Sequence, residues 1–177
     1  MKYEEIIEYL KTQEKELRAN KLNLVYRHIS SKHAGSITKF FLDNGIDPLK
    51  YLTIIPPQYA YNLKEYYDRE IIIPDNIEAV DLWAFADTFA RKLYIPSSVY
   101  YIREFAFSSA NLKSIYIDGC PGVSRKAFYD CFNLKDIKIN CTEEEWYKKN
   151  PDMSPDREDW PFAFEYVDLN AKLEFLK

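Results

Sequence analysis

The chain has 177 residues, and 47% of them are hydrophobic, so it is long enough to bury a sizeable core. Its 4 glycines exclude a collagen-like or glycine-rich disordered chain, and its formal net charge of −4 does not by itself indicate binding to nucleic acid or membranes. The three cysteines contain no Cys-x-x-Cys pair and do not have the pattern of a disulfide framework.

The N-terminus, Met1 to Glu5, is acidic and lacks the apolar segment of a secretory signal peptide. The sequence also lacks an apolar run of about 18 residues, which would indicate a membrane-spanning helix. We therefore expect a soluble protein that stays in the cytoplasm and keeps its thiols reduced.

Residues 1–70 are expected to form a helical domain. Apolar residues at helical spacing predict one helix over about 3–18 and a second over 20–30. Ser36 is a candidate N-cap for a third helix, which would end at Asn44-Gly45.

The charge of the chain is unevenly distributed. Residues 11–40 hold seven basic and two acidic side chains, whereas residues 71–177 hold 13 basic and 18 acidic ones. This asymmetry suggests an alternative function, contact with nucleic acid, although a solvated helix face is the simpler explanation. The basic side chains concerned are Lys11, Lys15, Arg18, Lys21, Arg27, Lys32 and Lys39.

Internal repeats dominate the sequence from residue 71 onward. A short apolar triad, typical of a strand, recurs every 22 residues, at 71–73, 93–95, 115–117 and 137–139. An Ala-Phe pair lies between successive triads, at 84–85, 106–107 and 127–128. A weaker apolar echo precedes each pair, at Ile77 and Val80, Val99 and Ile102, and Val123.

A period of 22 residues predicts a solenoid, because such short strands bury their apolar side chains only by stacking on their neighbours. The third residues of the triads should then form one buried column, and the phenylalanines a second column on the opposite wall. The predicted fold is therefore α+β, a short leucine-rich-repeat solenoid of about three units over residues 71–149, after the helical domain and before a C-terminal cap.

The segments 95–107 and 127–139 resemble the BspA-like leucine-rich repeat, whose pattern runs I-P-x-S-V-x-x-I-x-x-x-A-F and then N/S-L-x-x-I-x-I. The segment 141–146, Cys-Thr-Glu-Glu-Glu-Trp, resembles an element that often ends such arrays. The resemblance implies a non-catalytic protein that binds another macromolecule. Because this short chain lacks an export signal, it resembles the phage and prophage members, which implies an inhibitor of a host protein or defence complex in the host cytoplasm.

Alternate residues of a strand face outward, so Tyr94, Tyr116 and Lys138 should line the outer face of the sheet after Ile72. Tyrosine is a favoured contact residue at protein interfaces. The sequence therefore predicts a partner-binding surface at these residues, although stacked tyrosines that merely shield the ladder would have the same pattern. Further residues expected to flank that surface are Tyr100, Tyr101 and Arg103.

Residues 150–177 are expected to form the C-terminal cap, with a strand near 162–167, a helix over 169–176 and packing against Trp146.

The sequence contains no motif for a serine nucleophile, a phosphate-binding loop or a metalloprotease, so we expect no enzyme and no cofactor. His28 and His33 lack the cysteine or acidic neighbours of a metal site, and Cys120 and Cys131 lack a nearby base. The sequence names neither the partner nor the oligomeric state.

Overall fold

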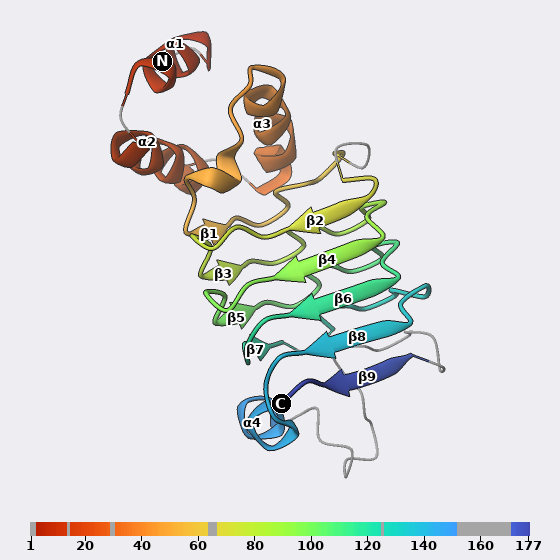
Figure 1. Cartoon of the computed structure of the whole chain (residues 1–177). Coiled ribbons are helices and arrows are strands. Elements are labelled where there is room, and N and C mark those ends of the chain that lie inside the picture. Colours follow the sequence, from red (N-terminus) through yellow and green to blue (C-terminus); the bar gives the residue numbers. More distant parts are fainter. Residues whose placement is uncertain (1–2, 14, 29–30, 64–66, 125, 152–170) are drawn as a thin grey trace.

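The computed structural model describes residues 3–13, 15–28, 31–63, 67–124, 126–151 and 171–177. Three helices stand at one end of the molecule, and below them the chain winds through successive coils whose strands form two parallel sheets (Figure 1). A short helix and the C-terminus lie at the opposite end. The predicted α+β solenoid is confirmed.

The N-terminal helices are α1 (Tyr3–Thr12), α2 (Lys15–His28) and α3 (Ser31–Asp43), followed by the 3-10 helix η1 (Pro48–Lys50). The predicted single helix over 3–18 is wrong, since α1 ends at Thr12, whose hydroxyl donates to the Tyr9 carbonyl at 2.9 Å. The predicted start of the third helix at Ser36 is also wrong. The buried side of α3 already includes Ala34, so packing selects an earlier start than the capping pattern does.

Gly35 is where α3 approaches the first coil. A Cβ built at Gly35 would overlap the carbonyl oxygen of Tyr61 and would lie 2.8 Å from its carbonyl carbon. Both are backbone atoms, so a Gly35→Ala substitution would force the helix away from the coil.

We expect Gly35→Ala to lower the free energy of unfolding by about 1–3 kcal/mol, as over-packing does. Helix propensity alone predicts the opposite effect, an increase of about 1 kcal/mol in the free energy of unfolding. Urea unfolding followed by circular dichroism distinguishes the two. Ser36→Ala, at an exposed neighbour on the same helix, is the control and should not destabilise. Equal stability of both variants would show that the close contact is unimportant.

The longer sheet contains the apolar triads, as predicted. Its strands are β2 (Glu70–Ile72), β4 (Lys92–Ile95), β6 (Ser114–Ile117), β8 (Asp136–Ile139) and β9 (Lys172–Phe175), adjacent in that order and all parallel. The 22-residue period places equivalent residues opposite one another, so Ile95, Ile117 and Ile139 are register partners and all are buried.

The second sheet was not predicted as strands. It contains β1 (Ile54–Ile55), β3 (Ala79–Val80), β5 (Tyr101–Ile102) and β7 (Gly122–Val123), again parallel and in chain order. The weak apolar echo was its signal, since Val80, Ile102 and Val123 are register partners. The division of the chain at residues 70 and 149 stays a prediction, but this sheet already begins at Ile54.

The predicted phenylalanine column is confirmed. The rings of Phe85 and Phe107 stack with centroids 5.5 Å apart and planes within 4°, and those of Phe107 and Phe128 are 5.2 Å apart and within 8°. All three side chains are fully buried. Tyr59 packs on the end of the column, with 5.7 Å between its ring centroid and that of Phe85. Its ring centroid lies 6.1 Å from that of Tyr26 on α2, so Tyr59 connects the solenoid to the helices.

The C-terminal end is closed by α4 (Glu143–Lys149) and by β9. Thr142 caps α4 in a capping box with Glu145. The predicted helix over 169–176 is wrong, because Lys172–Phe175 alternates polar and apolar residues and pairs with the edge of β8. The predicted strand near 162–167 lies outside the described residues. The predicted packing of the C-terminal segment against Trp146 is confirmed, since the ring centroids of Trp146 and Phe175 are 6.4 Å apart.

Candidate protein-binding surface

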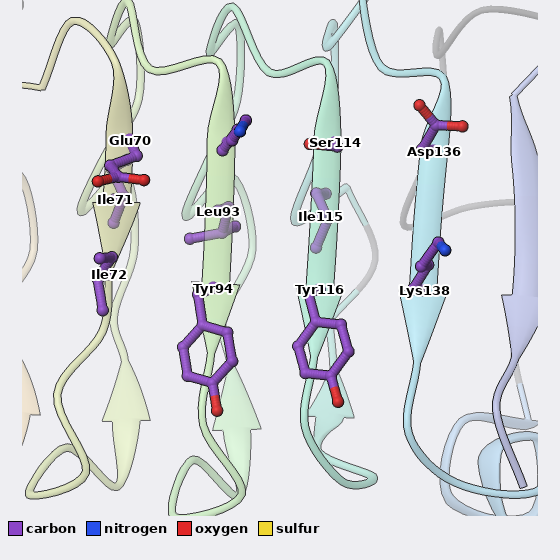
Figure 2. Close-up of a pocket in the computed structure, with 11 residues that line it drawn as sticks. Glu70, Ile71, Ile72, Leu93, Tyr94, Ser114, Ile115, Tyr116, Asp136 and Lys138 are labelled. Carbon is purple, nitrogen blue, oxygen red and sulfur yellow. The ribbon is translucent and has the colours of Figure 1, made fainter.

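The outward side chains of four neighbouring long strands form two parallel rows, which together we call the tyrosine face (Figure 2). They enclose a shallow groove of about 620 Å³. The first row contains Glu70, Lys92, Ser114 and Asp136, and the second contains Ile72, Tyr94, Tyr116 and Lys138. The row of Tyr94, Tyr116 and Lys138 after Ile72 lies where the sequence analysis placed it.

Tyr94 and Tyr116 form the centre of the tyrosine face. Their rings stack in parallel, with centroids 5.4 Å apart and planes within 4°. Both rings point toward the carboxyl ends of the strands, and their hydroxyl groups lie beyond the strand tips (Figure 2). Partial desolvation, and then the nearby Asp118 and Asp75 carboxylates, raise the pKa of Tyr94. The two stacked rings therefore present a flat, amphipathic platform.

Apolar and charged side chains border this platform on opposite sides. Ile72 is 58% exposed, a high fraction for an isoleucine. At the other end Lys138 forms an ion pair with Glu174 of β9, with 3.3 Å between Nζ and Oε2. An apolar and aromatic centre with a charged rim is typical of protein interfaces.

The family model described as the BspA type leucine rich repeat region matches residues 50–149 in 6 copies, which is more than half of the chain. The chain belongs to this family. No curated protein and no solved structure matches it significantly. BspA-type and other leucine-rich repeats are generally protein-interaction modules and are typically not enzymes.

The prediction that Tyr100, Tyr101 and Arg103 flank the tyrosine face is wrong. In this leucine-rich repeat Tyr101 lies in β5, which pairs with β3 and β7 of the second sheet rather than with a long strand, and Tyr100 and Arg103 directly precede and follow β5. The Tyr101 hydroxyl lies 2.7 Å from Ser124 Oγ, and Arg103 donates to Asp81 at 3.2 Å. These contacts connect successive coils of the second sheet.

Two of the described basic residues of the helical end are paired with acidic neighbours. Lys11 is paired with Glu8 and Lys39 with Asp43, each on its own helix. Arg27 is exposed and Lys21 half-buried, while the side chains of Lys15, Arg18 and Lys32 lie outside the described part. Nucleic-acid contact through residues 11–40 stays a prediction, which a binding assay at low salt would test.

In the described part of the chain the histidines and cysteines do not gather at one site, although Cys120 and Cys141 contact each other. Burial raises the pKa of Cys131 to about 12, so its thiol is a poor nucleophile at neutral pH. His28 and His33 are both exposed on helices. Within the described ranges no three His, Cys, Asp or Glu side chains gather as a metal site would require. None of the helices in those ranges has the length and apolar character needed to cross a bilayer.

A second aromatic cluster, on the edge formed by the Ala-Phe turns, was missed from the sequence. Trp83 and Phe105 stack with centroids 4.5 Å apart, and Phe105 meets the edge of Tyr129 at 5.8 Å. Lys126 lies 5.1 Å from the centre of the Tyr129 ring. The signal was the residue before each Ala-Phe pair, which is Trp83, Phe105 and Lys126 in successive coils.

Proposed function

We propose that this leucine-rich repeat protein binds another protein through the tyrosine face and has no catalytic role. The main observation that supports this proposal is the stacked Tyr94–Tyr116 pair in the centre of an open groove. Burying such aromatic side chains at an interface contributes strongly to affinity, and a rigid ring loses little conformational entropy on binding.

The tyrosine face suits this role better than the turn edge. Four neighbouring strands build it with regular backbone pairing, so its side chains are held in a fixed array before a partner arrives. The aromatic side chains of the turn edge, Trp83, Phe105 and Tyr129, stand on turns rather than on paired strands. A preorganised surface costs less to immobilise on binding.

A narrower form of the proposal is that the chain is a phage-encoded inhibitor, which occupies a surface of a host protein or defence complex in the host cytoplasm. Its support is the small size of the array, which led us to expect a phage or prophage member of the family from the sequence. Capture of partners from a lysate of the source cell, with identification by mass spectrometry, tests this form directly.

We expect the double variant Tyr94→Asp and Tyr116→Asp to weaken partner binding on the order of tenfold or more, because it replaces the aromatic centre by two charges. Kd measured by calorimetry with the captured partner checks this, and circular dichroism checks that the variant is folded. Tyr100→Asp is the matched control, since Tyr100 is 57% exposed but outside the long sheet. Unchanged Kd in the folded double variant would refute this choice of surface.

A further inference from the structure

A column of basic residues runs along the corner where the chain enters the long sheet. One basic residue directly precedes each of four successive long strands, at intervals of 22 residues, and all four are exposed. Backbone hydrogen bonds of 2.8 to 2.9 Å connect each member to the next, which keeps them in register. We call this set the basic column: Arg69, Arg91, Lys113 and Lys135.

The basic column does not follow from the needs of the fold. Like charges on neighbouring strands lie about 4.8 Å apart and repel one another. Within the described part of the chain, no acidic side chain forms an ion pair with any of the four. The buried leucines and isoleucines beside them account for the stacking of the coils, and a neutral polar residue would serve equally well at these positions.

We propose that the basic column binds an acidic segment of the partner protein, with carboxylates spaced about one helical turn apart. The inference rests on the proposed function, since the same partner would contact the tyrosine face beside the column. Side chains one turn apart on a helix lie about 5–6 Å from each other, close to the spacing between strands. Long lysine and arginine side chains easily absorb the remaining difference.

A polymer of phosphates such as a nucleic acid fits this corner less well than carboxylates on a protein do. Glu70 and Asp136 stand beside the column in the first row of the tyrosine face, and the whole chain carries a net charge of −4. These carboxylates would repel a continuous anionic backbone, whereas a protein helix can place its acidic residues only on the side that faces the column. Tyr94 and Tyr116 already stack on each other, so they offer no separate platforms for bases.

The test uses the full chain and two alanine-based peptides of identical composition, labelled with a fluorophore. One peptide carries four glutamates along one helical face, and the other carries them scattered around the helix. Fluorescence anisotropy should show that the one-faced peptide binds more tightly and that its affinity falls with salt. Equal binding of both peptides, or tighter binding of a labelled oligothymidine, would overturn the proposal.

The double variant Arg91→Gln and Lys113→Gln should weaken binding of the one-faced peptide on the order of tenfold. It should leave the melting temperature unchanged or raise it, because repulsion within the column is relieved. The control is Lys148→Gln with Lys149→Gln, an exposed pair on α4. An equal effect of both double variants would mean that binding depends only on the overall charge of the protein, and would refute the site.

Failure of this inference can be distinguished from failure of the proposed function with the natural partner. If the tyrosine variants lose the partner and the column variants keep it, the tyrosine face binds and the basic column does not. If the partner still binds both sets of variants, both proposals fail. Loss of binding in both sets is the expected result.

Discussion

Replacing Phe107 with alanine should lower the free energy of unfolding by about 3–5 kcal/mol, the usual cost of removing a buried phenylalanine ring. The side chain is fully buried and stacks on Phe85 on one side and on Phe128 on the other. Its loss leaves a cavity between two coils, and a stacked array cannot close that cavity without shifting both ladders of backbone hydrogen bonds. The loss of stability should therefore be near the upper end of this range.

Urea unfolding at neutral pH, monitored by far-ultraviolet circular dichroism, measures this effect. Phe132→Ala is the matched control, because Phe132 is 63% exposed in the next coil and its replacement should change stability by no more than about 0.5 kcal/mol. A similar small change in both variants would mean that the phenylalanine column is not a stabilising core.

The same columns explain why the long sheet was predictable. A buried position in a solenoid recurs at the repeat length, and within each strand side chains alternate between core and solvent. Isoleucine at the third position of each triad therefore indicated both the strands and their register. The outward placement of Tyr94 and Tyr116 followed from the same alternation, but a sequence pattern does not say whether an outward tyrosine contacts a partner.

Elements that depend on few residues were not predictable in the same way. Each strand of the second sheet has only two residues, too few to show an alternating pattern. The turns place bulky residues such as Trp83 and Phe105 at positive φ, near +58° and +56°, a conformation that their residue type disfavours. Backbone hydrogen bonds between coils, such as that from Phe105 to Lys126 at 3.1 Å, hold this conformation in place. Coil stacking thus overrides local preference there.

The basic column shows a different limit. Its four members recur at the same interval as the isoleucines, so the sequence contained the signal. A single charged residue in each repeat does not belong to the apolar pattern that indicates the buried core. Their significance emerges only when the register shows that equivalent residues of successive coils are neighbours.

Asn150 ends the second sheet, and its replacement by alanine should lower the free energy of unfolding by about 2–4 kcal/mol. Among the described residues no strand follows β7 in the second sheet, and the Asn150 side chain takes that place. Its Oδ1 accepts from the Val123 amide at 2.7 Å, and its Nδ2 donates to the Pro121 carbonyl at 3.0 Å. The equivalent carbonyl one coil earlier, that of Tyr100, accepts from the Gly122 amide at 2.9 Å. Alanine would leave buried groups unsatisfied, at about 1–3 kcal/mol each.

Urea unfolding of Asn150→Ala and of Asn133→Ala compares the stability lost at the end of the sheet with that lost when an ordinary asparagine hydrogen bond is removed. Asn133 also donates, to Asn111 Oδ1 at 2.7 Å, but it is exposed, so water replaces the lost bond and the cost should stay below about 1 kcal/mol. Asn150→Asp sharpens the comparison, because its carboxylate keeps the acceptor for Val123 but loses the donor to Pro121. Protonation restores a donor, and burial favours the neutral acid, so this variant should regain stability relative to the unaltered chain as the pH falls. If the free energy of unfolding of Asn150→Asp instead fell on acidification, the side chain would not be substituting for a missing strand.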